Sequence, residues 1–107
     1  MLAKKYRTID EYMMAGAGMR LFKELGTHVL VESSKVLSAA DKDKFSRSLS
    51  RIDEVCCHAE DNMFSDFPEL GSEYTDVFYG NVSSSPRGEV DKAQMERAKQ
   101  VADELFK

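Results

Sequence analysis

Two pairs of ionisable residues have a spacing that suits metal binding. Glu24 precedes His28 by four positions, and Glu54 precedes His58 by the same interval. Residues four apart share a helix face, so each pair can present a carboxylate and an imidazole to one ion. Di-iron bundles use a related pattern, but with Glu-x-x-His spacing and further carboxylates. We therefore predict Glu24, His28, Glu54 and His58 as candidate metal ligands. The alternative is a solvated or structural role for both histidines.

The position of the turn between the two helices decides whether these pairs meet. With a turn centred near Ser38, His28 and His58 would lie roughly 13 Å apart along the helix axis, at about 1.5 Å per residue. They converge only if the turn is centred near Asp43. The sequence contains no Glu-x-x-Glu, and its only Gly-x-Gly lies inside an expected helix. We predict no catalytic residue and no cofactor, and we leave open whether the protein is an enzyme.

The element that must position these residues is a long helix expected over residues 8–37. Thr8 is suited to the N-cap position, and Glu11 completes a capping box three residues later. Apolar residues cover roughly half of the helix circumference, whereas an ordinary surface helix has a stripe of about 100°. One neighbouring element cannot cover so wide an arc. The helix should therefore contact at least two others.

Glycines interrupt this helix at Gly16, Gly18 and Gly26. Each costs up to about 1 kcal/mol relative to alanine in a helix interior. They either permit the close approach of another helix or mark a kink or break, and the sequence leaves both readings open.

Three further helices are expected over residues 39–64, about 69–79 and about 89–106. In the first of these, apolar residues follow the alternating spacing of four and three that is typical of a helix packed in a bundle. They are Phe45, Leu49, Ile52, Cys56, Ala59 and Met63. We predict an all-α protein, a largely antiparallel helical bundle, with residues 1–107 in a single domain.

Aromatic residues gather around the expected short helix. They are Phe64, Phe67, Tyr74, Phe78 and Tyr79, and we call them the aromatic cluster. One interpretation is a cap that closes an end of the bundle. The other is a partner surface, in which these rings are anchors and acidic neighbours favour a basic partner.

Composition narrows the functional classes. The net charge of −4 argues against nucleic-acid binding, which needs a basic face. Charged residues interrupt the only segment that resembles a signal peptide, so we expect neither export nor a membrane span. The two cysteines, Cys56 and Cys57, are neighbours that cannot easily bridge each other, which predicts reduced thiols and a cytoplasmic protein.

These observations lead to two hypotheses about function. The first is a small cytoplasmic interaction or regulatory protein without catalysis. The second is a metal-binding bundle or small metalloenzyme that uses the two Glu-x-x-x-His pairs. The wide apolar arc of the first helix and the apolar Phe106 terminus also suggest a homodimer, so the expected partner is another protein or a second copy.

Overall fold

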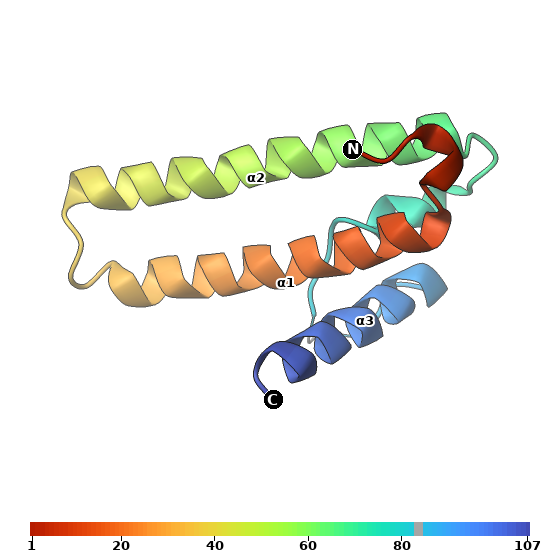
Figure 1. The fold of residues 1–107 in the computed structure, drawn as a ribbon. Coiled ribbons are helices and arrows are strands. Elements are labelled where there is room, and N and C mark those ends of the chain that lie inside the picture. The colour runs from red at the N-terminus through yellow and green to blue at the C-terminus, as the bar shows by residue number, and fades with distance from the viewer. Residues whose placement is uncertain (83–84) are drawn as a thin grey trace.

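The protein is a helical hairpin with a third helix packed on one side. The computed structural model describes residues 1–82 and 85–107, and in these ranges it contains the α-helices α1 (Ile9–Ser33), α2 (Ala39–Asp66) and α3 (Glu89–Leu105) and no strand. Two short 3₁₀ helices, η1 (Lys4–Tyr6) and η2 (Ser72–Asp76), lie in the connections. Helices α1 and α2 are antiparallel, and α3 lies on the side of α1 away from α2 (Figure 1). The all-α prediction is confirmed.

Both long helices begin where their capping residues predict. The side chain of Thr8 accepts a hydrogen bond from the Glu11 N–H at 3.2 Å, and that of Ser38 accepts one from the Asp41 N–H at 3.1 Å. Each bond satisfies one of the N–H groups that a helix start leaves unpaired. The end of α1 was predicted less well, because the helix stops at Ser33 rather than at residue 37. The Ser33 carbonyl closes a tight turn there, accepting from the Leu37 N–H at 3.0 Å.

Helix α1 is continuous through its glycines, and two of them permit close packing. A Cβ at Gly16 would overlap the carbonyl oxygen of Val77, and one at Gly26 would lie 2.6 Å from Leu49 Cδ2. The neighbour at Gly26 is a helix, which was one of the two alternatives that the sequence left open. The neighbour at Gly16 is instead the backbone of an irregular segment that follows η2. Helix α1 therefore contacts more than one neighbour, as predicted. Helices α2 and α3 reach only the margins of its wide apolar arc, whose centre stays exposed at Phe22, Leu25 and Val29.

Burial along the hairpin falls toward its turn. The predicted stripe of α2 is buried at Cys56 and Met63 but only half-buried at Phe45, Leu49 and Ile52. The core gathers near the α2 C-terminus, where Tyr12 of α1 joins Cys56 and Met63. The segment that follows α2 supplies Val77 and Phe78 to this core. In Figure 1 this segment and α3 both lie away from the turn, so the turn end of the hairpin is left with less cover.

The predicted helix over residues 69–79 is wrong in extent. Only the 3₁₀ helix η2 forms, and residues 77–80 are irregular. Val77 and Phe78 are buried there, and the carbonyls of Asp76 and Val77 accept hydrogen bonds from side chains of α1 and α3. Gly80 has φ +143°, which also ends any helix. Tertiary contacts therefore replace the local hydrogen bonds that a helix needs.

The fit at Gly16 predicts a stability difference between two glycines of the same helix. Gly16→Ala should lower the free energy of unfolding by about 1–3 kcal/mol. The added methyl group would overlap the backbone carbonyl of Val77, which is buried and cannot easily move away. Gly18→Ala is the matched control. Its methyl group meets no described atom within 4 Å, and it should stabilise the helix by up to about 1 kcal/mol. Urea denaturation of dilute protein, followed by circular dichroism, measures both. Equal effects at the two positions would contradict the packing described.

Candidate functional site

A buried ion pair joins α1 to the rest of the molecule. Arg20 is 1% exposed, and its Nη2 lies 2.6 Å from Oδ1 of Asp91 on α3. The same nitrogen donates to the carbonyl of Asp76, and Nη1 donates to the carbonyl of Asn81 at 3.1 Å. One side chain of α1 thus holds α3 and both ends of the segment 76–82.

A second arginine completes the surroundings of Asp91. The Arg87 backbone N–H donates to Asp91 Oδ2 at 2.8 Å, and its Nη2 lies 3.1 Å from Oδ1 of Asp76. Burial raises the pKa of Asp91, but the hydrogen bonds from Arg87 and Arg20 outweigh it and hold that pKa at about 2. A Cβ at Gly80 would lie 2.8 Å from the Arg20 guanidinium, so the glycine also makes room for these contacts.

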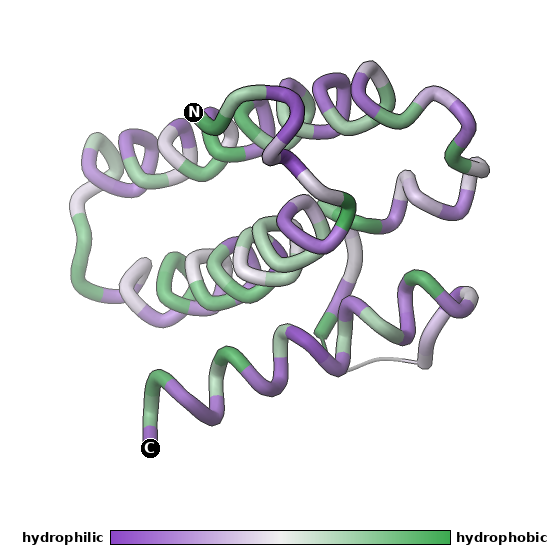
Figure 2. Tube along the Cα trace, turned by 45° about the vertical axis from the view of Figure 1, so that its right-hand side comes forward, coloured by the Kyte–Doolittle hydropathy of each residue, from purple (hydrophilic) through white to green (hydrophobic). Residues whose placement is uncertain are grey.

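Further contacts fix α3 over the N-terminal half of α1. The buried amide of Gln94 donates to the carbonyl of Met13 at 2.8 Å and to that of Val77 at 2.7 Å. At the surface, Arg97 Nη1 lies 3.1 Å from Asp10. In Figures 1 and 2, α3 runs in the same general direction as α1 from this anchored end. In Figure 1 its C-terminal end lies alongside the middle of α1.

An apolar groove opens between α1 and α3 beyond these polar contacts. It has a volume of about 290 Å³ and is lined by Gly18, Leu21, Phe22, Leu25, Val101, Leu105 and Phe106. Phe22 is 53% exposed, Leu25 50%, Leu105 68% and Phe106 76%. In Figure 2 hydrophobic and hydrophilic colours alternate along the C-terminal end of α3, as expected of a helix with one apolar side. We call it the α1–α3 groove.

A second groove adjoins the first on the other side of α1. It has a volume of about 330 Å³ and is lined by Phe22, Gly26, Phe45, Ser48, Leu49 and Ile52. Phe22 lines both grooves, so they form one continuous apolar surface across three helices. None of the described residues that line it is charged. We call the two grooves together the apolar surface.

The predicted partner surface, the aromatic cluster, extends from the C-terminal end of α2 to the middle of the hairpin, where the Tyr79 hydroxyl donates to the Asp53 carbonyl at 3.5 Å. Its ring at Phe78 is buried, and the other four are half-buried: Phe64, Phe67, Tyr74 and Tyr79. Phe67 packs edge-on against Tyr12, with 6.3 Å between ring centroids, and Lys23 Nζ lies 4.3 Å above the ring of Tyr79. Burial, with nearby acidic groups and thiols, raises the pKa of Tyr79 to about 12. These rings pack against the core of the molecule, and their role in binding a partner stays a prediction.

The two candidate metal pairs lie in different surroundings. Glu24 and His28 line a polar cavity of about 510 Å³ beside residues 80 and 81, where Glu24 accepts a hydrogen bond from the Val82 N–H at 3.1 Å. Glu54 and His58 are exposed on α2 and do not line this cavity. Across the described residues, no three His, Cys, Asp or Glu side chains are grouped so that they could hold a metal ion. The structure thus does not bring the pairs together in one cavity, and the metal site stays a prediction.

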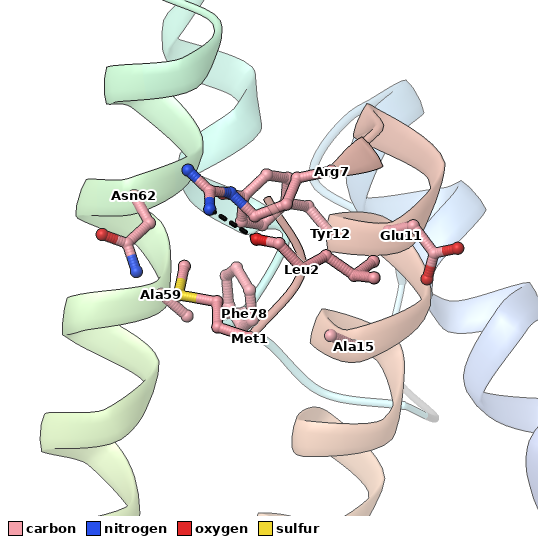
Figure 3. Close-up of a pocket in the computed structure, with 9 residues that line it drawn as sticks. All are labelled: Met1, Leu2, Arg7, Glu11, Tyr12, Ala15, Ala59, Asn62 and Phe78. Carbon is pink, nitrogen blue, oxygen red and sulfur yellow. Dashed lines mark hydrogen bonds between the residues drawn. The ribbon is translucent and has the colours of Figure 1, made fainter. Parts of the chain in front are cut away.

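A smaller cavity lies beneath the N-terminal residues, as Figure 3 shows. Met1 and Leu2 cover it, and its walls include Tyr12 of α1, Ala59 of α2 and Phe78. Its volume of about 210 Å³ is below the roughly 300–1,000 Å³ that is usual for ligand pockets. We interpret it as a gap beneath the N-terminal segment and not as a ligand site.

The N-terminal segment is held by a carboxylate network. Arg7 donates to Leu2 O at 2.8 Å and pairs with Asp66 of α2 at 2.7 Å, and the Tyr12 hydroxyl donates to Asp66 at 2.5 Å. The hydrogen bonds from Arg7, and then that from Tyr12, lower the pKa of Asp66 to about 2. This network links residues 1–7 to both helices of the hairpin.

Sequence reasoning did not find the Arg20–Asp91 pair or Gln94. A signal was present only on the last helix, because Asp91 and Gln94 are polar residues among the apolar positions Val90 and Ala98 of its stripe. Arg20 gave no such signal, since it lies on the side of the first helix away from the predicted apolar arc. A charged residue on a core-facing stripe is seldom buried without a partner. The sequence does not say which residue that partner is, since Arg20 and Asp91 are 71 positions apart.

Comparisons of this chain with known protein families, with curated proteins and with solved structures find no match. None of the helices in residues 1–82 and 85–107 is both long and apolar enough to cross a membrane. The two cysteines, one buried and one exposed, are both free thiols.

The buried pair predicts a large effect of removing one charge. Asp91→Asn should lower the free energy of unfolding by roughly 3–5 kcal/mol, because it leaves the Arg20 guanidinium buried without a counter-charge. Asp103→Asn, at an exposed position of the same helix, should change it by less than about 0.5 kcal/mol. Urea unfolding measures both. Similar small changes in the two variants would show that the pair does not hold α3.

The Asp66 network predicts a specific pH dependence. Because its folded pKa is about 2, below the ordinary value of 3.8, the ionised group stabilises the fold fully above about pH 4. That contribution should disappear as the pH falls from about 4 to 2. The stability difference between the parent protein and Asp66→Asn should therefore shrink over this interval, when measured by urea unfolding at several pH values. A difference that stays constant from pH 7 to 2 would contradict the assignment, and exposed Asp61→Asn is the control.

Proposed function

We propose that this protein is a non-catalytic interaction module that binds a protein partner through its apolar surface. The observation that carries the proposal is the exposure of large apolar side chains along two adjoining grooves. Phe22, Leu25, Leu105 and Phe106 are each half-exposed or more. Scattered apolar residues on a protein surface are ordinary, but a continuous patch is typical of an interaction site.

The size of the patch supports this reading. A fully exposed large side chain presents about 200 Å², so the exposed fractions of these four residues amount to roughly 500 Å². The largest apolar patch on a typical monomer is about 300–600 Å² and is often functional. The half-buried residues that line the grooves add to that area.

The chemistry of the lining supports a protein partner over a charged ligand. None of the described residues lining either groove carries a charge, so a phosphate or carboxylate ligand would find no counter-charge there. Aromatic anchors next to shallow grooves are the features that often dominate the binding energy of protein interfaces. Phe22, between the two grooves, is the anchor of this proposal.

The aromatic cluster is the less favoured contact surface. Its rings are buried or half-buried against the core. A partner that docked there would gain less newly buried area from each ring than at the apolar surface.

The metalloenzyme hypothesis needs both Glu-x-x-x-His pairs. Glu24 and His28 line one cavity, and Glu54 and His58 do not line it.

Site-specific photo-crosslinking tests the proposal. A photoreactive phenylalanine analogue at position 22 should, on illumination in the cells that make the protein, join it to one discrete protein, because the ring at this position would lie inside the interface. The same analogue at His58, on the exposed outer side of α2, is the control and should give no such adduct. Absence of an adduct at position 22, or the same adducts from both positions, would contradict the proposal.

A further inference from the structure

No contact inside the described part of the molecule requires a glycine at position 18 of α1. A Cβ at Gly16 or Gly26 would overlap a neighbouring segment, so these two glycines permit internal packing. A Cβ at Gly18 would meet no described atom within 4 Å. Glycine costs about 1 kcal/mol relative to alanine at such a position, and its usual compensation is the close approach of another backbone or ligand. Gly18 lines the α1–α3 groove, so that approach would come from outside the molecule.

The residues that follow Gly18 have the spacing of a helix-pairing seam. Gly18, Phe22, Leu25 and Val29 are separated by four, three and four positions, and Phe22, Leu25 and Val29 are exposed. This alternation places side chains along one line of a helix, where they pack as knobs into the holes of a facing helix. The occupant that fits this line is therefore a helix. We call these four residues the seam.

The seam is complementary to itself. The protruding ring of Phe22 lies one helical turn from the bare backbone of Gly18. When two copies of α1 face each other in antiparallel orientation about a two-fold axis, each Phe22 ring can lie over the Gly18 of the other copy. Such a contact buries the same patch on both molecules, which is the arrangement of most homodimers.

We propose, resting on the proposed function above, that the partner is a second copy of this chain, docked seam to seam with Phe22 of each copy over Gly18 of the other. The exposed apolar area of roughly 500 Å² provides much of the roughly 800 Å² per partner in a standard interface. The ends of Leu105 and Phe106 border the seam and extend the contact. The uncharged lining lets two copies of a chain with net charge −4 meet without bringing like charges together at the centre.

A lipid surface fits this patch less well. Helices that lie on membranes usually carry lysine and arginine beside the apolar face, where these bind anionic headgroups. The exposed charged residues that border this patch have mixed signs, since Asp103 and Glu104 precede Leu105, whereas Lys107 follows Phe106 and Arg51 precedes Ile52. Such a border offers no uniformly basic face to anionic headgroups.

Sedimentation velocity of the full chain over about 1–100 µM tests the inference. We expect the parent protein to reach a dimer, and Phe22→Glu to remain a monomer that keeps its thermal midpoint when diluted. Val31→Glu is the matched control, because Val31 is exposed on the opposite side of α1 and lines the polar cavity. It should dimerise like the parent.

Gly18→Ala separates the interface from the fold. A methyl group there should weaken dimerisation roughly tenfold or more, because it would occupy the place of the partner's Phe22 ring. The diluted monomer should unfold at the same or a higher temperature than the parent. Weakening accompanied by a destabilised monomer would overturn this role of Gly18.

The outcomes separate this inference from the proposed function. A parent protein that stays monomeric at 100 µM overturns the second copy as partner, while an adduct of position 22 with another protein would leave the interaction proposal standing. A dimer that survives Phe22→Glu overturns the seam as its interface. An adduct at position 22 with twice the mass of the chain, together with a dimer that Phe22→Glu abolishes, supports both.

Discussion

The rest of the structure depends on the need to neutralise the buried charge of Arg20. Taking a guanidinium out of water costs several kcal/mol unless a counter-charge and hydrogen-bond acceptors surround it. Asp91 supplies the charge, and the carbonyls of Asp76 and Asn81 supply acceptors. These partners come from α3 and from both ends of the segment 76–82. If either element left its place, the guanidinium would lose its counter-charge or its carbonyl acceptors.

Such a pair is better understood as a source of specificity than of net stability. Apolar residues of similar volume often replace buried ion pairs without loss of stability. Here the polar contacts that hold α3 are also incompletely satisfied, because Arg20 Nε and Gln94 Oε1 are buried without a hydrogen-bond partner among the described residues. The pair determines where α3 lies along α1. An apolar α3 stripe could slide along α1, whereas Arg20 accepts Asp91 in only one register.

That register determines which part of α1 remains open. Because Asp91 lies near the start of α3 and Gln94 reaches Met13, the helix is held over the N-terminal half of α1. The turn end of the hairpin then receives no cover from α3, and Phe22 and Leu25 stay half-exposed. The polar contacts and the apolar surface are therefore two consequences of one placement. A loosened ion pair would also loosen Val101 and Leu105, which form one wall of the α1–α3 groove.

The local features of this fold could be read from the sequence, and the long-range ones could not. Thr8 and Ser38 cap their helices as predicted because a cap needs only the next three residues. The α2 stripe likewise follows from spacing alone. Residues 77–79 were predicted as the end of the helix over 69–79, because Leu70, Tyr74, Val77 and Phe78 would share one side of it. Their backbone is instead drawn against Gly16 and Arg20, which lie some 60 positions earlier in the chain.

The same limit explains the choice between two candidate surfaces. The aromatic residues of the sequence are most concentrated in residues 64–79. A concentration of rings is expected both in a core and in an interface, so it does not distinguish the two. Which rings are buried is decided by the elements that polar contacts bring over them, and here those contacts enclose Val77 and Phe78. Phe22 stood in the sequence as one apolar residue of a wide arc. Two features of the structure make it a candidate anchor. Helix α3 leaves its ring half-exposed, and it lies one helical turn from Gly18, a glycine that no described internal contact requires.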